Sequence, residues 1–234
     1  MTMAWSRVRM ALLVLVTGGT ACGGTADRSQ ASGAQAGNDN GTRATATVLL
    51  IGTSLTAGYG LDPEQAWPAM IQARVDSAGL PFAVVNAGVS GETSAGALRR
   101  LDWLLEQEVP RVVLVETGAN DGLRGQSIDS LEANLDAILG RLGSLQPRPV
   151  LIVAGMEALP NLGARYTNAF RSLYPRLARA HDAVFLPFLL DGVAGIARFN
   201  QADGIHPNAA GSERIAENVW RVLGPVLDSV AGGQ

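Results

Sequence analysis

The amino-acid sequence predicts a three-layer α/β domain, in which helices cover both faces of a five-stranded parallel sheet. Short runs of consecutive apolar residues alternate along the chain with longer segments whose apolar residues recur at helical spacing. Continuous apolar runs are typical of strands that are buried on both faces. Strands that alternate with helices are typical of parallel sheets joined by right-handed crossovers. We therefore expect a doubly wound, flavodoxin-like topology in one domain, which is the size that 234 residues allow.

The expected strands are the five apolar runs at 48–51, 82–85, 111–115, 150–153 and 183–186. A first helix is expected to begin at Asp62, a capping residue that is followed by Pro63 at the first helical position. The remaining helices are indicated by apolar faces within residues 98–105, 128–142, 170–177 and 215–223. In parallel sheets ligands bind beyond the carboxyl ends of the strands, so functional residues are expected in the segments that follow them.

The N-terminus has the features of an export signal. Arg7 and Arg9 precede a short apolar run at 10–16, which is far below the roughly 20 residues that a membrane span requires. Cys22 follows Gly19-Thr20-Ala21, which resembles a bacterial lipobox with Gly19 in place of the usual leucine. The alternative is an ordinary signal peptide followed by a cysteine without a role. A lipidated Cys22 is favoured, because a free thiol is a liability in an oxidising compartment.

Three segments are expected along the chain. Residues 1–21 are predicted to be a lipoprotein signal peptide, residues 22–47 the lipidated cysteine with a disordered tether, and residues 48–234 the folded domain. The tether is predicted because its small and polar residues cannot bury enough apolar surface to become ordered. The expected location is the bacterial cell envelope, on the periplasmic side or the cell surface, with the lipid anchor as the only membrane contact.

Composition excludes several kinds of partner. The formal net charge of −3 and the pI near 5.4 provide no basic surface for nucleic acid. No glycine-rich phosphate-binding loop follows the first strand, which argues against a nucleotide-binding protein. Two histidines and one lipidated cysteine are too few ligands for a zinc site, so neither a metal nor a cofactor is expected. We expect a monomer that acts on a small-molecule substrate.

A serine lies two residues beyond the first expected strand. Ser54 stands between Gly52 and Gly58, where its hydroxyl group can point out of the carboxyl edge of the sheet. This position suits a nucleophile. The alternative is a helix N-cap, which is the commonest role for a serine at the start of a helix.

The base is sought between two histidines. His181 is expected at the end of a helix on the opposite edge of the sheet, where a histidine usually interacts with the helix dipole. His206 follows Asp203 by three residues, just ahead of the last helix. A carboxylate at this spacing can accept the Nδ1–H of the imidazole and fix its tautomer. The alternative is a surface turn with a helix that starts at Pro207.

Two other segments at the same edge can supply hydrogen-bond donors. Gly91 lies in the glycine-containing segment after the second strand, and Asn120 follows the third strand. An acyl-transfer site needs such donors where the oxyanion forms. Each segment alone is better explained as turn chemistry. Because nucleophile, base, orienting carboxylate and donors all fall at one edge of one sheet, we favour an active site.

These segments resemble the conserved blocks of the SGNH, or GDSL-type, hydrolase family, in the usual order and over the whole folded domain. The blocks are Gly52-Thr53-Ser54-Leu55, the segment around Gly91, Gly118-Ala119-Asn120-Asp121 and Asp203-Gly204-Ile205-His206. The chain is most similar to the periplasmic thioesterase I branch, also called protease I or lysophospholipase L1. Two departures are Thr53 in place of the family's aspartate and Ala119 in place of a glycine. The lipidated tether is an addition to that branch.

The resemblance implies the SGNH hydrolase fold and an acyl-serine mechanism. Ser54 is then the nucleophile, His206 the base and Asp203 its orienting partner, with Gly91 and Asn120 as oxyanion donors. The expected substrates are aryl esters, acyl-CoA thioesters and lysophospholipids. The acyl chain is expected in a groove lined by four residues: Leu123, Met156, Leu159 and Pro160. The alternatives are a short-acyl deacetylase or arylesterase, and a catalytically silent lipoprotein that binds a partner at the envelope.

Overall fold

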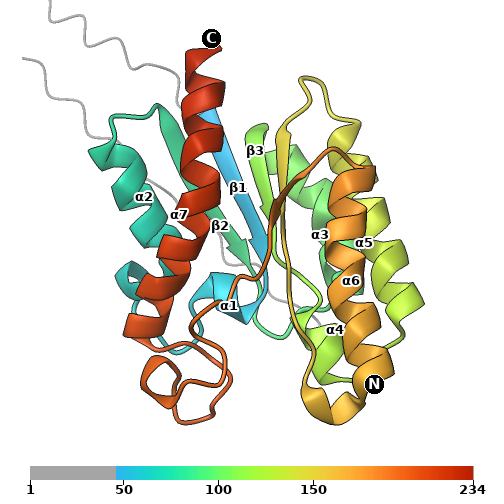
Figure 1. Ribbon diagram of the computed structural model, residues 1–234. Coiled ribbons are helices and arrows are strands. Elements are labelled where there is room, and N and C mark those ends of the chain that lie inside the picture. The colour runs from blue at the N-terminus through green and yellow to red at the C-terminus, as the bar shows by residue number, and fades with distance from the viewer. Residues whose placement is uncertain (1–45, 234) are drawn as a thin grey trace, which may run out of the picture. The chain divides into compact units, whose positions relative to one another are not determined.

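The computed structural model describes residues 46–233 and confirms the predicted fold class (Figure 1). The five strands are β1 (Ala46–Gly52), β2 (Phe82–Gly88), β3 (Pro110–Val115), β4 (Val150–Ala154) and β5 (Val184–Leu186). They form one parallel sheet in the order β2-β1-β3-β4-β5. The expected signal peptide, Cys22 and nearly all of the expected tether lie outside the described residues.

Two helix layers cover the sheet. On one side α2 (Trp67–Ser77) packs against α7 (Ala209–Gly232), and on the other α5 (Ile128–Gly143) packs between α3 (Ser94–Gln107) and α6 (Ala164–Ala180), as Figure 1 shows. No helix within residues 46–233 is both long and apolar enough to cross a membrane.

The central strands are the core of the domain. Val48, Leu49, Leu50 and Ile51 of β1 have no exposed surface, as expected of a strand with helices on both faces. β1 begins at Ala46, two residues before the apolar run, because Ala46 and Thr47 pair with the start of β2. Paired backbone, rather than apolar side chains, therefore sets the beginning of this strand.

The helical start expected at Asp62 is present, with Asp62 as the cap and Pro63 at the first position, but it does not continue into α2. Residues Pro63–Gln65 form a single 3-10 turn, and α2 begins only at Trp67 after an extended Ala66. The reason is Pro68, which has no N–H and whose ring would clash with the carbonyl of residue 64 inside a continuous helix. Pro68 is tolerated because it lies in the first turn of α2.

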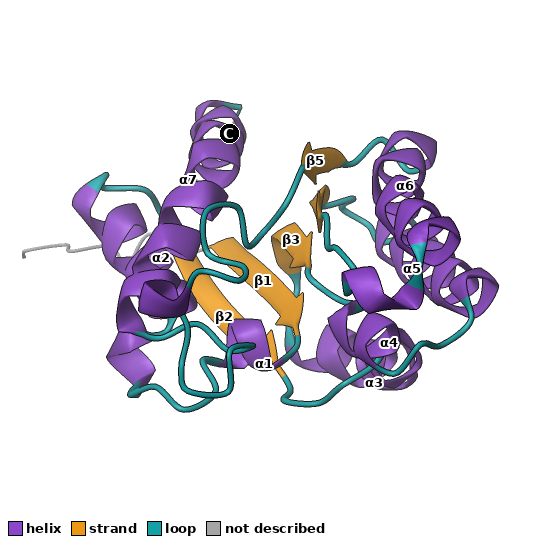
Figure 2. Ribbon diagram, turned by 60° about the horizontal axis from the view of Figure 1, so that its bottom comes forward, coloured by secondary structure: helices purple, strands orange, loops and turns teal. Residues whose placement is uncertain are grey.

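Two short helices not expected from the sequence lie at the carboxyl edge of the sheet. They are α1 (Ser54–Ala57) after β1 and α4 (Ala119–Leu123) after β3, and Figure 2 brings this edge toward the viewer. Further 3-10 turns are Pro160–Leu162 and Ala197–Phe199. β1 and β3 are neighbours in the sheet although β2 lies between them in sequence, so their helical crossovers run in opposite directions. This topological switch point is where doubly wound sheets bind ligands.

Candidate active site

Ser54 is the first residue of α1 and lies at the switch point. A tight turn leads to it from β1, and a Cβ atom built on Gly52 would lie 2.0 Å from Thr56 Oγ1. The helix ends after one turn at Gly58, whose φ of 74° favours glycine. Thr53, not Ser54, occupies the N-cap position. The Ser54 hydroxyl is therefore not the helix cap, and the side chain stands at the edge of the sheet with 8% of its residue surface exposed.

Asp203 and His206 are joined in a tight turn before α7. One carboxylate oxygen of Asp203 accepts from the backbone N–H groups of Ile205 and His206 at 2.9 and 3.0 Å. The other oxygen lies 2.7 Å from His206 Nδ1. The hydrogen bond to the His206 side chain and those to the two backbone N–H groups lower the pKa of Asp203 to about 2. Asp203 is therefore an anion, and Nδ1 of His206 carries the proton of this hydrogen bond.

The same imidazole reaches Ser54. His206 Nε2 lies 3.0 Å from Ser54 Oγ, across 152 residues of sequence. With its proton on Nδ1, the neutral imidazole has a free acceptor at Nε2, so the Ser54 hydroxyl donates to it. The three side chains thus form one hydrogen-bonded chain from hydroxyl to imidazole to carboxylate, which is the arrangement that activates a serine.

The long connection before α7 is held by the side-chain amides of two asparagines. Asn200 Nδ2 donates to the carbonyl oxygens of Val193 and Ile196 at 2.7 and 2.9 Å. Asn208 caps α7 by accepting from the N–H of Gly211 at 3.0 Å. These bonds replace regular secondary structure along the segment that carries Asp203 and His206, and they fix its course.

Gly91 and Asn120 lie beside Ser54 on the other side of the site. Gly91 has a φ of 77°, which is strained for any residue with a side chain. Asn120 lies in α4, and its Nδ2 donates one hydrogen to the carbonyl of Glu92 at 2.9 Å. An amide carries two such hydrogens, so one remains for a reacting oxygen. Sequence motifs placed both residues at this edge, and the structure brings them into the cavity that Ser54 lines.

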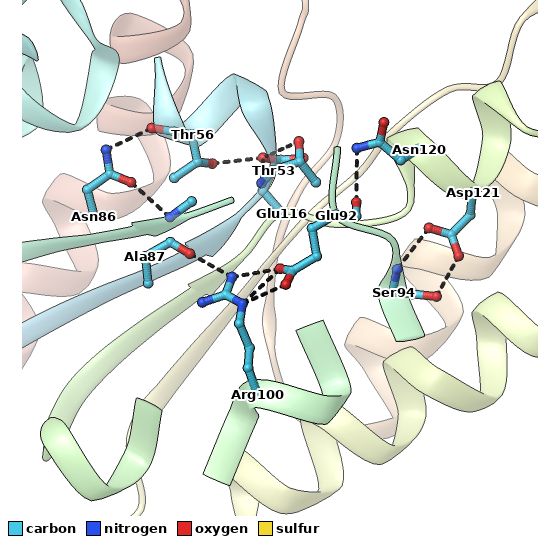
Figure 3. A network of polar contacts seen from close by, with 11 residues as sticks. Thr53, Thr56, Asn86, Ala87, Glu92, Ser94, Arg100, Glu116, Asn120 and Asp121 are labelled. Atoms are coloured by element: carbon cyan, nitrogen blue, oxygen red, sulfur yellow. Dashed lines mark hydrogen bonds and ion pairs between the residues drawn. The ribbon is translucent and has the colours of Figure 1, made fainter. Parts of the chain in front are cut away.

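Two groups of polar contacts hold these donors in place (Figure 3). Glu92 and Arg100 pair at 2.7 Å with side chains that are 8% and 19% exposed, and Arg100 also donates to the carbonyl of Ala87 at 2.7 Å. Asp121 accepts from the N–H and the hydroxyl group of Ser94 at 2.9 and 2.6 Å. The oxyanion segment and α4 are therefore both tied to α3, and donors held in this way need little reorganisation during reaction.

A cavity of about 660 Å³ opens beside the nucleophile. Its lining includes Ser54, His206, Gly91 and Asn120. Each of the four residues expected to hold an acyl chain also lines it: Leu123, Met156, Leu159 and Pro160. Leu123 and Leu159 are 41% and 46% exposed, whereas Met156 is buried. The cavity is in the size range of small-molecule sites, and its walls are mainly apolar.

Several residues near the site were missed in the sequence. The ring of Tyr59 packs on His206 with 4.5 Å between ring centroids, and Phe188 and Leu190 form a second apolar wall of the cavity. Phe188 and Leu190 could have been found from their position after β5, because the segments after the strands lie at the same edge of the sheet. Glu116 lies buried against the turn that carries Ser54. Its signal was a charged residue at the end of an apolar strand.

His181 lies apart from this site. It ends α6, and its Nε2 lies 2.7 Å from a carboxylate oxygen of Asp136 on α5. The imidazole is thus paired with a specific carboxylate on a neighbouring helix, beyond any interaction with the helix dipole. Within residues 46–233 no three histidine, cysteine, aspartate or glutamate residues are grouped closely enough to hold a metal ion.

A doubly wound sheet with serine, histidine and aspartate hydrogen-bonded in sequence at its carboxyl edge defines a serine hydrolase. Residues 50–214 match the GDSL-like lipase/acylhydrolase family, and the chain belongs to that family. The predicted resemblance is thereby confirmed, and with it the general class of carboxylic ester hydrolase.

Similar proteins match more than three quarters of the chain. The chain is 43% identical to esterase TesA of Pseudomonas aeruginosa over 181 residues, which are 77% of this chain and 89% of that protein. It is 40% identical to thioesterase 1/protease 1/lysophospholipase L1 of Escherichia coli K12, over 78% of this chain and 85% of that protein. A crystal structure of TesA superposes with a TM-score of 0.73 at 41% identity, over 77% of this chain and 99% of that one.

Proposed function

We propose that this hydrolase cleaves esters and thioesters of apolar acyl chains through an acyl-enzyme intermediate on Ser54. One observation carries the proposal: the 3.0 Å contact between Ser54 Oγ and His206 Nε2 lies in the wall of an apolar cavity. An activated serine needs a carbonyl carbon within reach, and an apolar cavity beside it selects the group attached to that carbon.

In the first half of the reaction Ser54 attacks the carbonyl carbon of the substrate. Its proton passes to His206 Nε2, and Asp203 stabilises the imidazolium that forms. The oxyanion accepts hydrogen bonds from the N–H groups of Ser54 and Gly91 and from the free amide hydrogen of Asn120. The bond to the alcohol or thiol then breaks, and the leaving group takes the proton back from His206.

Water completes the reaction by the same steps. It attacks the acyl-serine carbonyl and gives a proton to His206, and the ester bond to Ser54 breaks as that proton returns to Oγ. The products are a carboxylic acid and the free enzyme. His206 therefore receives one proton and returns one proton in each half of the reaction.

The apolar lining favours acyl chains of medium length over acetyl groups. Leu123, Met156, Leu159 and Pro160 line the cavity together with the nucleophile, so a growing chain gains contact with each added methylene. Aryl esters, acyl-CoA thioesters and lysophospholipids are the substrate classes that combine such a chain with an activated or accessible carbonyl. A short-acyl deacetylase is the alternative. A silent binding lipoprotein is disfavoured, because binding alone has no need of the hydrogen-bonded Ser54, His206 and Asp203.

We expect kcat/KM for aryl esters to climb from acetyl to medium chains and then to level or fall. Each buried methylene contributes about 0.8 kcal/mol, which is about three- to fourfold in kcat/KM until the cavity is full. The measurement is a chain-length series with one leaving group, repeated with acyl-CoA thioesters. If acetyl esters are the best substrates and every longer chain loses rate, the short-acyl reading replaces this one.

Leu159→Ala should flatten that climb and spare acetyl ester turnover. Leu159 is 46% exposed where it lines the cavity, and a bound chain would cover it. Val109→Ala is the matched control, because Val109 is 73% exposed and does not line the cavity. A Leu159→Ala protein with an unchanged chain-length profile would place the acyl chain elsewhere in the cavity.

We also propose that the protein is exported and held at the bacterial envelope by lipid on Cys22. The proposal rests on the signal-like N-terminus and the position of its cysteine. A lipidated bacterial cysteine carries three acyl chains, which anchor a protein firmly, whereas a single chain anchors it only marginally. In a bacterial host the full chain should fractionate with membranes, and Cys22→Ser should release it.

A truncated protein that keeps β1 from its first residue, Ala46, should be soluble and fully active, because the residues before it contribute no candidate catalytic group. The full chain in the soluble periplasmic fraction would contradict lipidation. That result would mean that Gly19 prevents recognition of the lipobox.

A further inference from the structure

Glu116 is a carboxyl group with no exposed surface in the core of the domain. It follows β3 directly, and its backbone N–H donates to the carbonyl of Ile51 in β1 at 2.8 Å. The residue therefore continues the pairing of the two central strands to the switch point. Its side chain lies against the turn that begins where β1 ends.

Three donors from the nucleophile turn surround this carboxylate (Figure 3). Glu116 Oε2 accepts from the N–H of Thr53 and from Thr56 Oγ1, both at 2.8 Å. The hydroxyl group of Thr53 lies 3.0 and 3.1 Å from the two carboxylate oxygens. The contacts lie on both sides of Ser54, one residue before it and two residues after it. Ser54 is thus held between two points that are attached to the same buried group.

Thr53 is the residue whose conformation aims the nucleophile turn. Its ψ angle orients the peptide unit that carries the Ser54 N–H, and Glu116 holds both its backbone and its side chain. The family has aspartate at this position. An ionised aspartate cannot donate to a carboxylate, whereas threonine can, so in this chain residue 53 and Glu116 form a donor–acceptor pair.

We propose that Glu116 is a positioning residue for acylation, which fixes the Thr53–Thr56 turn so that Ser54 Oγ faces His206 and the Ser54 N–H faces the developing oxyanion. The proposal rests on the function proposed above. Glu116 acts through Thr53 and Thr56 and touches no reacting atom. It deepens the mechanism by assigning the orientation of the nucleophile to a residue 62 positions away in the chain.

The free-energy cost of burying the Glu116 carboxyl group indicates that the residue has a functional role. Burial raises the pKa of Glu116 to about 7, although the bonds from Thr53 and Thr56 act in the opposite direction. An apolar side chain would fill the same space without this desolvation penalty. A buried carboxyl group whose charged form is disfavoured, and which lies beside a reaction centre, is typical of a site that exchanges stability for activity.

The titratable groups in the same surroundings are on two other elements. Tyr174 of α6 and Asp121 of α4 interact electrostatically with one another, and the charge of Glu116 also helps to raise the pKa of Tyr174. Neither of them shifts the pKa of Glu116 itself. The pH dependence of stability at this carboxyl group therefore follows from its burial.

The test begins with Glu116→Gln and Thr53→Val. We expect either change to lower kcat for a medium-chain aryl ester by roughly ten- to a hundredfold, with KM within about twofold. The rate of fluorophosphonate labelling at Ser54 should fall in parallel. In the double variant the losses should not multiply, because both changes break the same contact. Thr53→Ser keeps the hydroxyl and should restore most of the rate.

Thermal unfolding separates positioning from general support of the fold. Because the folded-state pKa of Glu116 is raised, its stabilising contribution is complete below the unfolded pKa and is lost as pH rises through about 7. A glutamine at this position cannot ionise. The Tm of Glu116→Gln relative to the wild type should therefore increase between about pH 5 and about pH 8, while kcat stays low.

Thr117→Val is the matched control. Thr117 is buried next to Glu116, and its hydroxyl has no hydrogen-bond partner within residues 46–233. This change should keep kcat and Tm near the wild-type values.

Three results would overturn the proposal. They are wild-type kcat in Glu116→Gln, multiplicative losses in the double variant, and a Tm of Glu116→Gln at about pH 8 that falls below the wild-type Tm together with activity. In each case the wild-type protein itself would still hydrolyse the ester. Failure of the proposed function would instead appear as a wild type with no esterase or thioesterase activity.

Discussion

Ser54→Ala is expected to abolish both ester turnover and labelling by a fluorophosphonate. The hydroxyl is the group that His206 Nε2 contacts at 3.0 Å, and alanine leaves nothing to form the acyl intermediate. Loss of a serine nucleophile typically lowers kcat by about a millionfold, and the rate that remains comes from the oxyanion donors and substrate binding. The measurement is turnover of a medium-chain aryl ester, together with peptide mapping of the labelled residue.

Ser90→Ala is the control for this experiment. Ser90 lines the same cavity, but among the described residues its hydroxyl has no hydrogen bond to His206. Its replacement should leave the label on Ser54. Labelling that persists in Ser54→Ala would assign the nucleophile to another residue and remove the basis of the proposed mechanism.

The fold was predictable because its signal is local and repeated. Val48 to Ile51 form an uninterrupted apolar run, which is typical of a strand covered on both faces, and similar runs alternate with helical segments along the rest of the chain. The helical start at Asp62 stops after one 3-10 turn for an equally local reason, since Pro68 moves the start of α2 to Trp67. Helix α4 gave no signal, because five residues with a glycine and an aspartate show no period.

The candidate site could be predicted for residues that directly follow a strand, because the order of the strands could be predicted. Ser54 and Asn120 follow β1 and β3, and these strands are neighbours in the expected topology. Residues that act through a third residue were not accessible in this way. Glu116 meets Thr53 and Thr56 across 63 and 60 positions, and a single buried carboxylate has no spacing that a sequence pattern could reveal. Tyr59 meets His206 across the same edge from another segment.

His206→Ala is expected to lower kcat by several orders of magnitude, whereas His181→Ala should leave it nearly unchanged. The two histidines have similar surroundings at first sight, since each lies 2.7 Å from an aspartate oxygen. They differ in what the other side of the ring contacts. His206 Nε2 reaches Ser54 Oγ at 3.0 Å, while His181 contributes its Nε2 to the Asp136 contact itself. The pair of variants therefore separates catalysis from a surface contact between histidine and carboxylate, which contributes about 1 kcal/mol or less to stability.

Asp203→Asn tests the third member of the hydrogen-bonded chain, through the pH–rate profile of the variant. The hydrogen bond to His206 and the two backbone N–H bonds lower the pKa of Asp203 to about 2, so this carboxylate loses its charge only as pH falls through that region. Asparagine removes the charge at every pH and allows the wrong tautomer of His206. We expect a loss in kcat of about ten-thousandfold, measured as the ratio of the two rates on the pH-independent plateaus of the pH–rate profiles. A plateau kcat within about tenfold of the wild-type value would mean that Asp203 does not hold His206 as a permanent anion.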